Sequence, residues 1–263
     1  MKKTLQITNI IALLVTIFVN YLSNTGVFNG NTMASVSGEY QNLFTPAGYA
    51  FSIWGLIYIS LAGFIVYQSR GLFNNKQPDP DVANIGWLFV LTCVANCLWI
   101  IAWLYDYTGV SVLIMCALLF FLIQIIINTR MEMELISFKK VALLWWPFAL
   151  YTGWILLALV ANVAAFLTKI EWNRFGLSEV TWTLIMITVA GLVYLYLTWT
   201  RNLRESAMVG IWGLIAVAVA NWDNEQTIAY YAIAVSVILF ISNGIHGYQN
   251  KGRAFVLPNG KSM

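Results

Sequence analysis

The stretch from Phe44 to Tyr58 reads FTPAGYAFSIWGLIY and joins a polar loop to a long apolar segment. Its Thr45-Pro46-Ala47-Gly48 entry is typical of a helix start, because a proline in the first turn of a helix gives up no hydrogen bond. Phe51 and Trp54 are three residues apart, and Trp54 and Tyr58 are four apart, so the rings can share one helical face. Aromatic residues here are typical of interfacial anchoring in a membrane, but the same face could line a ligand pocket.

The composition of the chain places it in a membrane. Of its 263 residues 60% are hydrophobic and only 10% are charged, and the mean hydropathy is +0.74. The apolar runs are near-continuous and about twenty residues long, which indicates membrane helices rather than the short alternating strands of a barrel. The fold class we predict is therefore an all-α integral membrane protein whose main partner is the lipid bilayer. Cys93, Cys97 and Cys116 all lie in apolar runs, which suits packing better than a disulfide.

Eight apolar segments can be marked along the chain, connected by one long loop at 23–47 and otherwise by short turns. Their approximate bounds are 5–22, 48–68, 84–104, 110–128, 141–167, 181–200, 207–221 and 227–247. The first segment follows Met1-Lys2-Lys3, as a signal peptide would, but it is long for one and no clean cleavage site follows. We expect it to be a retained helix.

The basic residues predict the orientation of these helices. With a cytoplasmic N-terminus, twelve of the fourteen basic residues lie on the inner side, and only Lys169 and Arg174 lie outside. The positive-inside rule then favours both termini in the cytoplasm, and the short basic start favours a bacterial inner (plasma) membrane. The basic charge thus reports orientation and does not indicate nucleic-acid binding. The inner set is Lys2, Lys3, Arg70, Lys76, Arg130, Lys139, Lys140, Arg201, Arg204, Lys251, Arg253 and Lys261.

No charged residue falls in the middle of a predicted helix, and no catalytic set can be assembled. Proton pumps and ion-coupled transporters usually keep an ionisable residue at membrane depth. The single histidine, His246, falls near the inner end of the last segment, which suits an interfacial residue better than a metal or haem ligand. We therefore expect a protein that is not an enzyme and binds no metal.

Two further helical faces combine asparagine with aromatic residues. A buried amide without a partner costs about 1–3 kcal/mol, and a tryptophan offers a flat surface with one donor, so these faces suit either helix packing or a pocket for a flat apolar ligand. Hydrogen bonds between helices are the simpler interpretation. The faces are Asn96, Trp99 and Trp103 in the third segment, and Tyr151, Trp154, Ala158 and Asn162 in the fifth.

These three stretches, in this order, resemble the motifs of the tryptophan-rich sensory protein/translocator protein family (TspO/MBR, the peripheral benzodiazepine receptor family). Residues 44–58 resemble its W-x-P-P-x-W…W-x-x-L-Y entry, residues 96–103 its L-N-x-x-W-x-x-x-F motif, and residues 151–162 its P-Y-x-x-W-x-x-x-A-x-x-x-N motif. The resemblance covers about residues 1–173. It departs from the family at Ala47, which replaces the second proline, and at Leu150, where the last motif has its proline.

The resemblance implies a five-helix bundle at 1–173 whose pocket is closed by the loop after the first helix and accepts porphyrins, sterols and synthetic aromatic compounds. It implies no covalent cofactor, but a porphyrin or haem-type ligand. Residues 174–263 would then form a C-terminal extension of about three helices, which leaves the oligomeric state open. The ligand-binding residues we predict from the faces and the resemblance are Pro46, Phe51, Trp54, Tyr58, Asn96, Trp99, Trp103, Tyr151, Trp154, Ala158 and Asn162.

Three functions fit this prediction to different degrees. The first is a sensor or carrier that binds a flat hydrophobic molecule such as a tetrapyrrole or a sterol-like compound. The second is a secondary transporter, favoured by eight helices and by the recurrence of Ile53–Ile57 as Ile211–Ile215, but disfavoured by the lack of charge at membrane depth. The third, a porphyrin-degrading enzyme, ranks last because the segments supply aromatic residues but no acid or base.

Overall fold

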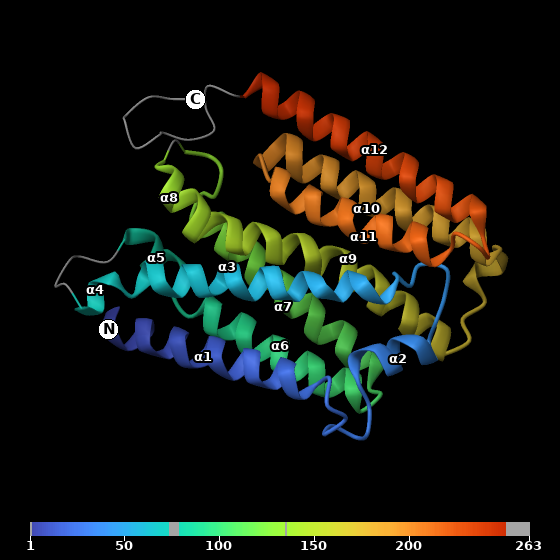
Figure 1. Cartoon of the computed structure of the whole chain (residues 1–263), viewed down its shortest axis with the longest axis horizontal. Coiled ribbons are helices and arrows are strands. Elements are labelled where there is room, and N and C mark those ends of the chain that lie inside the picture. The colour runs from blue at the N-terminus through green and yellow to red at the C-terminus, as the bar shows by residue number, and fades with distance from the viewer. Residues whose placement is uncertain (1, 74–78, 135, 251–263) are drawn as a thin grey trace.

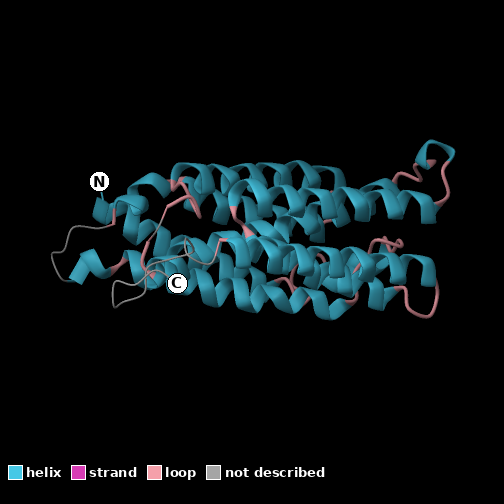
Figure 2. Ribbon diagram, turned by 90° about the horizontal axis from the view of Figure 1, so that it is seen from above, coloured by secondary structure: helices cyan, strands magenta, loops and turns pink. Residues whose placement is uncertain are grey.

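The computed structural model describes residues 2–73, 79–134 and 136–250, and every regular element in those ranges is a helix (Figures 1 and 2). Short helices and turns connect eight long ones, so the predicted all-α fold class is confirmed. The long helices are α1 (Lys2–Leu22), α3 (Ile53–Gln68), α6 (Leu88–Leu104), α7 (Thr108–Asn128), α9 (Trp146–Lys169), α10 (Glu179–Arg201), α11 (Arg204–Ala220) and α12 (Gln226–Gln249). The short elements are α2 (Met33–Glu39), α4 (Arg70–Phe73), α5 (Pro80–Ile85), α8 (Phe138–Lys140), the 3₁₀ turns Gly48–Ser52 and Arg174–Gly176, and a π turn at Val141–Trp145.

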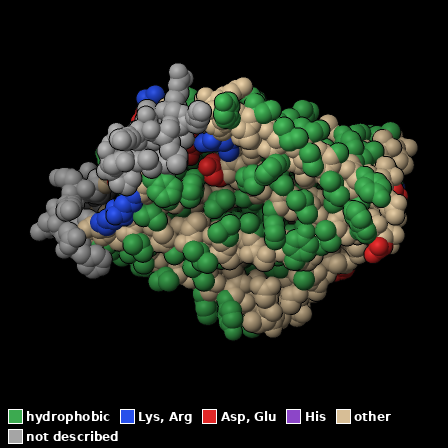
Figure 3. All heavy atoms as spheres, turned by 45° about the horizontal axis from the view of Figure 1, so that its top comes forward, with side chains coloured by type: hydrophobic (Ala, Val, Ile, Leu, Met, Phe, Trp, Pro, Cys, Tyr) green, Lys and Arg blue, Asp and Glu red, His purple; other side chains and the backbone are tan. Residues whose placement is uncertain are grey.

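Each of the eight predicted apolar segments forms one of the long helices. Within the described residues, six stretches are long and apolar enough to cross a membrane unaided. Both α6 and α11 have 17 residues, so they are shorter than a typical span of about 20 residues. Apolar side chains cover most of the surface in view, and charged side chains gather toward its ends (Figure 3). This pattern is that of a protein embedded in a bilayer.

Two predicted helices are interrupted near their first turns. The third was expected to run from 84, but Gly86 has a left-handed φ of 54° and separates α5 from α6. The fifth begins with the π turn, in which the Trp146 N–H donates to the Val141 carbonyl. Pro147 follows directly and has no N–H to donate, so the preceding turn widens before α9 becomes regular.

Helix α9 lies between two groups of helices. On one side it packs against α3 and α7 of the N-terminal group, and on the other against α11, which packs in turn on α10 and α12 (Figure 1). In the span Phe138–Lys169, which contains α9, half of the most apolar stretch is buried. This share is larger than in the other candidate membrane spans among the described residues. The C-terminal helices therefore cover an outer face of the N-terminal bundle. Whether residues 1–173 and 174–263 are separate domains remains a prediction.

Helices α9 and α11 approach each other closely at Gly153. A Cβ atom added there would lie 2.7 Å from the Ser206 carbonyl oxygen and 2.8 Å from its Cα atom. Two hydrogen bonds close the same contact: the Ser206 hydroxyl donates to the Ala149 carbonyl (2.7 Å), and the Tyr194 hydroxyl donates to the Gly153 carbonyl (2.7 Å). Close backbone approach through small residues is the usual way in which membrane helices associate without a hydrophobic driving force.

The start of α1 and the end of α12 lie at the same end of the bundle, together with α4, α5 and α8 (Figure 1). This agrees with an even number of crossings. Eight of the twelve basic residues assigned to the inner side fall in the described part of the chain, while positions 76, 251, 253 and 261 lie outside it. Which side of the membrane this end faces remains a prediction; we call it the inner end.

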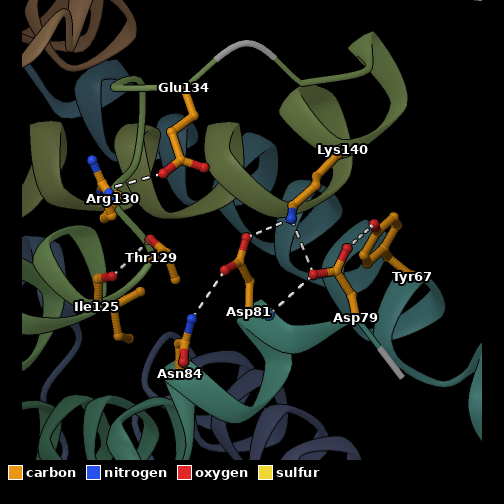
Figure 4. Close-up of polar contacts among 9 residues, drawn as sticks. All are labelled: Tyr67, Asp79, Asp81, Asn84, Ile125, Thr129, Arg130, Glu134 and Lys140. Carbon is orange, nitrogen blue, oxygen red and sulfur yellow. Dashed lines mark hydrogen bonds and ion pairs between the residues drawn. The ribbon is translucent and has the colours of Figure 1, made fainter. Parts of the chain in front are cut away.

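An ion-pair network fastens the helices at the inner end (Figure 4). The Lys140 ammonium lies 3.0 Å from the Asp79 carboxylate and 2.6 Å from that of Asp81, and the Tyr67 hydroxyl donates to Asp79 (2.7 Å). Burial alone would raise the pKa of Asp79, but the hydrogen bonds from Tyr67, the Asp81 N–H and Lys140 outweigh it and lower that pKa. The network joins the end of α3 and the start of α5 to the entry of α9.

The close approach at Gly153 predicts that adding a single methyl group there destabilises the protein. We expect Gly153→Ala to lower the thermal stability of the purified protein, since overpacking costs about 1–3 kcal/mol and the atoms in the way belong to the backbone. The control is Gly244→Ala on α12, where an added Cβ meets nothing within 4 Å and should be neutral or mildly stabilising. Equal melting temperatures for the two variants would contradict the tight α9–α11 contact.

Candidate functional site

A cavity of about 50 Å³, the first cavity, lies beneath α2 between the 45–51 segment, α6 and α9. Helix α2 closes it with Met33 and Ser37, in the position that the resemblance assigned to the loop after the first helix. Most of the wall is apolar and aromatic. Seven of the eleven predicted ligand-binding residues line this cavity: Pro46, Phe51, Trp99, Trp103, Trp154, Ala158 and Asn162.

A second cavity of about 320 Å³ adjoins the first and lies between α1 and α3. Two more of the predicted residues, Trp54 and Tyr58, belong to its wall. The end of α1 and the turn that follows it add polar side chains that sequence reasoning did not single out. These are Asn20, Tyr21, Ser23 and Asn24. The two cavities share three wall residues: Met33, Phe51 and Trp99. We call the two cavities together the aromatic chamber.

Trp54 is the centre of an aromatic cluster in the chamber wall. Its ring stacks on Tyr58 with centroids 5.4 Å apart and planes inclined by 20°, which confirms that these two rings share a face. It also lies 6.3 Å from the ring of Trp99 and 6.5 Å from that of Trp154. Residues from α3, α6 and α9 therefore meet around one indole, and their planes stand at different angles.

The two asparagines of the predicted faces bind other helices. Asn96 donates to the Tyr151 hydroxyl (2.9 Å) and accepts from the Asn20 amide (2.8 Å). Asn162 accepts from the Trp99 indole (2.9 Å) and donates to the Ser111 hydroxyl (2.8 Å). Both amides thus make the interhelical hydrogen bonds that the simpler interpretation expected. Asn96 and Tyr151 belong to neither cavity wall, and a ligand-binding role for them remains a prediction.

Two tryptophans of the first cavity, in contrast, have hydrogen-bonding capacity left over. The indole N–H groups of Trp103 and Trp154 are buried, and neither has an acceptor. The buried Tyr58 hydroxyl, in the second cavity, also has no partner. Buried donors without an acceptor are uncommon in folded proteins and cost about 1–3 kcal/mol each. The chamber therefore offers donors to a ligand or to water.

The C-terminal helices hold the mouth of the chamber, which we define as residues 43–50. Sequence reasoning missed this role because the partners are far apart in the chain. In addition, three of the four bonds join a backbone atom of the mouth to a side chain of α10, of α11 or of the residue after α11, and the fourth joins two backbone atoms. The bonds are Ala47 N–H to the Ala216 carbonyl (3.0 Å), the Asn221 amide to the Leu43 carbonyl (2.9 Å), Leu43 N–H to the Glu179 carboxylate (3.2 Å), and the Trp212 indole to the Ala50 carbonyl (3.2 Å).

Helix α2 is fastened over the chamber by a second set of polar contacts. The Tyr40 hydroxyl donates to the Asp106 carboxylate (2.8 Å), which also pairs with the Lys169 ammonium (2.6 Å). Desolvation and the hydrogen bond to Asp106 raise the pKa of Tyr40, so its hydroxyl remains a neutral donor at pH 7. This arrangement joins α2 to the α6–α7 turn and to the end of α9.

The fold and the chamber define an all-α membrane protein with an aromatic site beneath a short covering helix. A family described as TSPO-like protein matches residues 6–245, so the chain belongs to the TSPO-like family. The match continues through α10 and α11 into α12, beyond the residues 1–173 that carry the sequence motifs. No curated protein and no solved structure matches the chain.

The bonds at the mouth predict a remote effect on its backbone. Asn221→Ala removes the amide bond to the Leu43 carbonyl, worth about 0.5–1.5 kcal/mol, together with a bond to the Val217 carbonyl of α11 itself. Hydrogen–deuterium exchange in residues 43–50 should therefore become about two- to tenfold faster. Asn243→Ala, which removes a similar amide bond to the Arg204 carbonyl, is the matched control and should leave the mouth unchanged. Unchanged exchange in both variants would show that α11 does not hold the mouth.

Proposed function

We propose that this protein binds a flat hydrophobic molecule with hydrogen-bond acceptors in the aromatic chamber and acts as a sensor or carrier for it. A porphyrin or other tetrapyrrole fits this description, and so does a sterol-like compound, the classes that the family resemblance implies. The observation that carries the proposal is the pair of buried indole donors, Trp103 and Trp154, in a cavity whose other walls are mostly apolar.

The aromatic rings and the N–H donors would contact different parts of the ligand. Trp54 and Trp99 would contact the face of a flat ligand, where an aromatic pair contributes about 0.5–1.5 kcal/mol beyond the area it buries. Trp103 and Trp154 would donate to carbonyl, hydroxyl or carboxylate oxygens at its edge, and each would gain the acceptor it lacks. Asn96 and Asn162 would act indirectly, by holding Tyr151 and Trp99 in place.

The size of the chamber requires the two cavities to be used together. About 50 Å³ is too small for a tetrapyrrole, whereas small-molecule sites typically measure about 300–1,000 Å³, and the second cavity reaches that range. Phe51 stands in the wall between them, with its ring 6.1 Å from that of Trp154. A change of rotamer at Phe51 would join the cavities and expose both indole donors to one ligand.

The composition of the walls favours binding over catalysis. Among the described residues that line the two cavities there is no aspartate, glutamate, lysine, arginine or histidine. Of the usual acid–base groups of enzymes, the described residues of these walls supply only the phenols of Tyr21 and Tyr58. The chamber supplies surface and donors, which suits the reversible binding of a carrier or sensor.

The proposal is tested with protoporphyrin IX as the probe, titrated against the purified full chain while the shift of the porphyrin absorbance is followed. Replacing Trp103 or Trp154 by phenylalanine keeps an aromatic ring and removes the N–H, so each variant should bind about tenfold more weakly, as expected for the loss of a hydrogen bond to a charged acceptor. A porphyrin readout avoids the change in protein fluorescence that losing a tryptophan causes.

Trp199→Phe is the matched control, because that indole donates to Ser242 at the exposed side of α10 and lies in neither cavity wall. It should bind the probe like the parent. Saturable binding that all three variants share equally would place the porphyrin outside the chamber. No binding in the parent protein would remove tetrapyrroles from the proposal.

A further inference from the structure

A second concentration of unsatisfied polar groups lies at the inner end, away from the chamber. Four buried side-chain atoms there have no hydrogen-bond partner: Glu132 Oε1, Glu205 Oε2, Arg204 Nε and His246 Nδ1. They come from the loop after α7, from the first turn of α11 and from the last turns of α12. A group of such atoms from three segments calls for a physical reason, because buried polar groups are normally paired.

The surrounding contacts hold the two carboxyl groups in place. Glu205 accepts from the Trp146 indole through its other oxygen (3.0 Å). The backbone of Glu132 is fixed by the Asn202 amide, which donates to its carbonyl (2.7 Å), and the residue has a left-handed φ of 60°. The Asn202 bond holds Glu132 beside the chain segment that leads into α11, and the charge of Glu205 acts on Glu132.

The cations nearby do not neutralise both carboxylates. Arg204 is the basic group whose charge reaches Glu132, and it forms no ion pair within 4.0 Å in the described part of the chain. Its guanidinium Nη1 instead lies against Gly247 of α12, where an added Cβ atom would be 3.1 Å away. Arg130 pairs with Glu134 (3.2 Å) in the same loop, and Arg201 points a guanidinium N–H toward the Ile126 carbonyl (3.4 Å).

The histidine does not supply the missing charge. His246 is 3% exposed, and its ring packs edge-on against that of Trp199 with centroids 5.2 Å apart. Within the described residues no ion pair joins His246 to either carboxylate. Both carboxylates are half-buried, and each has one buried oxygen without a partner. Two such carboxylates with one partial counter-charge repel each other, and such a pair normally keeps a proton on one member.

We propose that Glu132 and Glu205 form a carboxyl pair that binds one proton at neutral pH and thereby docks the α7–α8 loop onto α11. The bound proton removes one negative charge from the buried group and supplies a donor for an oxygen that otherwise has none. Burial, and after it the charge of Glu205, raise the pKa of Glu132 to about 8, in agreement with this role.

The proton would couple the loop to pH in a defined direction. A glutamate in an unfolded chain titrates near 4.5, while Glu132 in the folded protein titrates higher. The stability that this group contributes is therefore fully present below about pH 4.5 and is lost as the pH rises through about 8. Above that range a second negative charge repels the loop from the first turn of α11.

Infrared spectroscopy of the reconstituted full chain tests the proposal, because the carbonyl stretch of a protonated carboxyl group is separate from the amide bands. The parent protein should show a carboxyl band at pH 7 that disappears as the pH is raised past about 8. The band should be absent in Glu132→Gln. In Glu205→Gln it should titrate at a lower pH, because the repelling charge has been removed while the burial of Glu132 remains.

Glu134→Gln is the matched control, since Glu134 lies two residues away in the same loop, is paired with Arg130 and should leave the band unchanged. A parent protein without a carboxyl band at pH 7 would overturn the proposal, and that result requires no variant to fold. Persistence of the same band in both Glu132→Gln and Glu205→Gln would overturn it as well, by assigning the proton to another group.

Discussion

The backbone contact between α9 and α11 at Gly153 is the constraint on which most of the structure depends. Because no Cβ atom separates the helices there, the Ser206 backbone approaches Gly153 directly, and hydroxyl groups of Ser206 and Tyr194 bind carbonyls of α9. The adjacent residue, Trp154, lines the first cavity. One face of α9 thus forms the wall of the site while a neighbouring face anchors the C-terminal helices, so the position of the wall depends on this packing.

The polar side chains inside the bundle are of two kinds. Some form hydrogen bonds that hold the helices together, and others have no partner and could bind a ligand. The amides of Asn96 and Asn162 each donate and accept hydrogen bonds between helices, which is a favourable arrangement for a polar group in an apolar interior. The indoles of Trp103 and Trp154 are buried without acceptors. Buried polar atoms without a hydrogen-bond partner therefore occur in the chamber, where they include indole donors, and at the carboxyl pair near the inner end, where they are glutamate oxygens.

Most of the fold could be predicted from the sequence, because membrane helices are encoded by long local runs of apolar residues. All eight segments were located, and they differ from the structure where Gly48–Ser52 forms a 3₁₀ turn before α3, where Gly86 breaks a helix and where a π turn precedes Pro147. Helical spacing also identified the chamber wall, since Trp54, Trp99 and Trp154 do converge. Periodicity on one helix shows which residues share a face, and aromatic faces in lipid usually turn toward other helices.

The remaining features depend on pairs that no local pattern reveals. Spacing marked Asn96 as a pocket candidate, yet its partners Asn20 and Tyr151 lie on two other helices, and only the assembled bundle shows that the amide is already satisfied. The role of α11 at the mouth was missed for the same reason. Charge counting along the sequence also says nothing about Glu132 and Glu205, whose unpaired buried oxygens appear only in the folded protein.

The bonds that hold the mouth form late in the synthesis of the chain. The side chains that bind Leu43 and Ala50 belong to Glu179, Trp212 and Asn221. These residues are separated from their partners by 136 to 178 residues of sequence. During synthesis the long helices that line the chamber therefore enter the membrane while residues 43–50 still lack these partners. The chamber acquires its final entrance only when α11 arrives, and a chain interrupted before that point would carry the aromatic wall without a fixed opening.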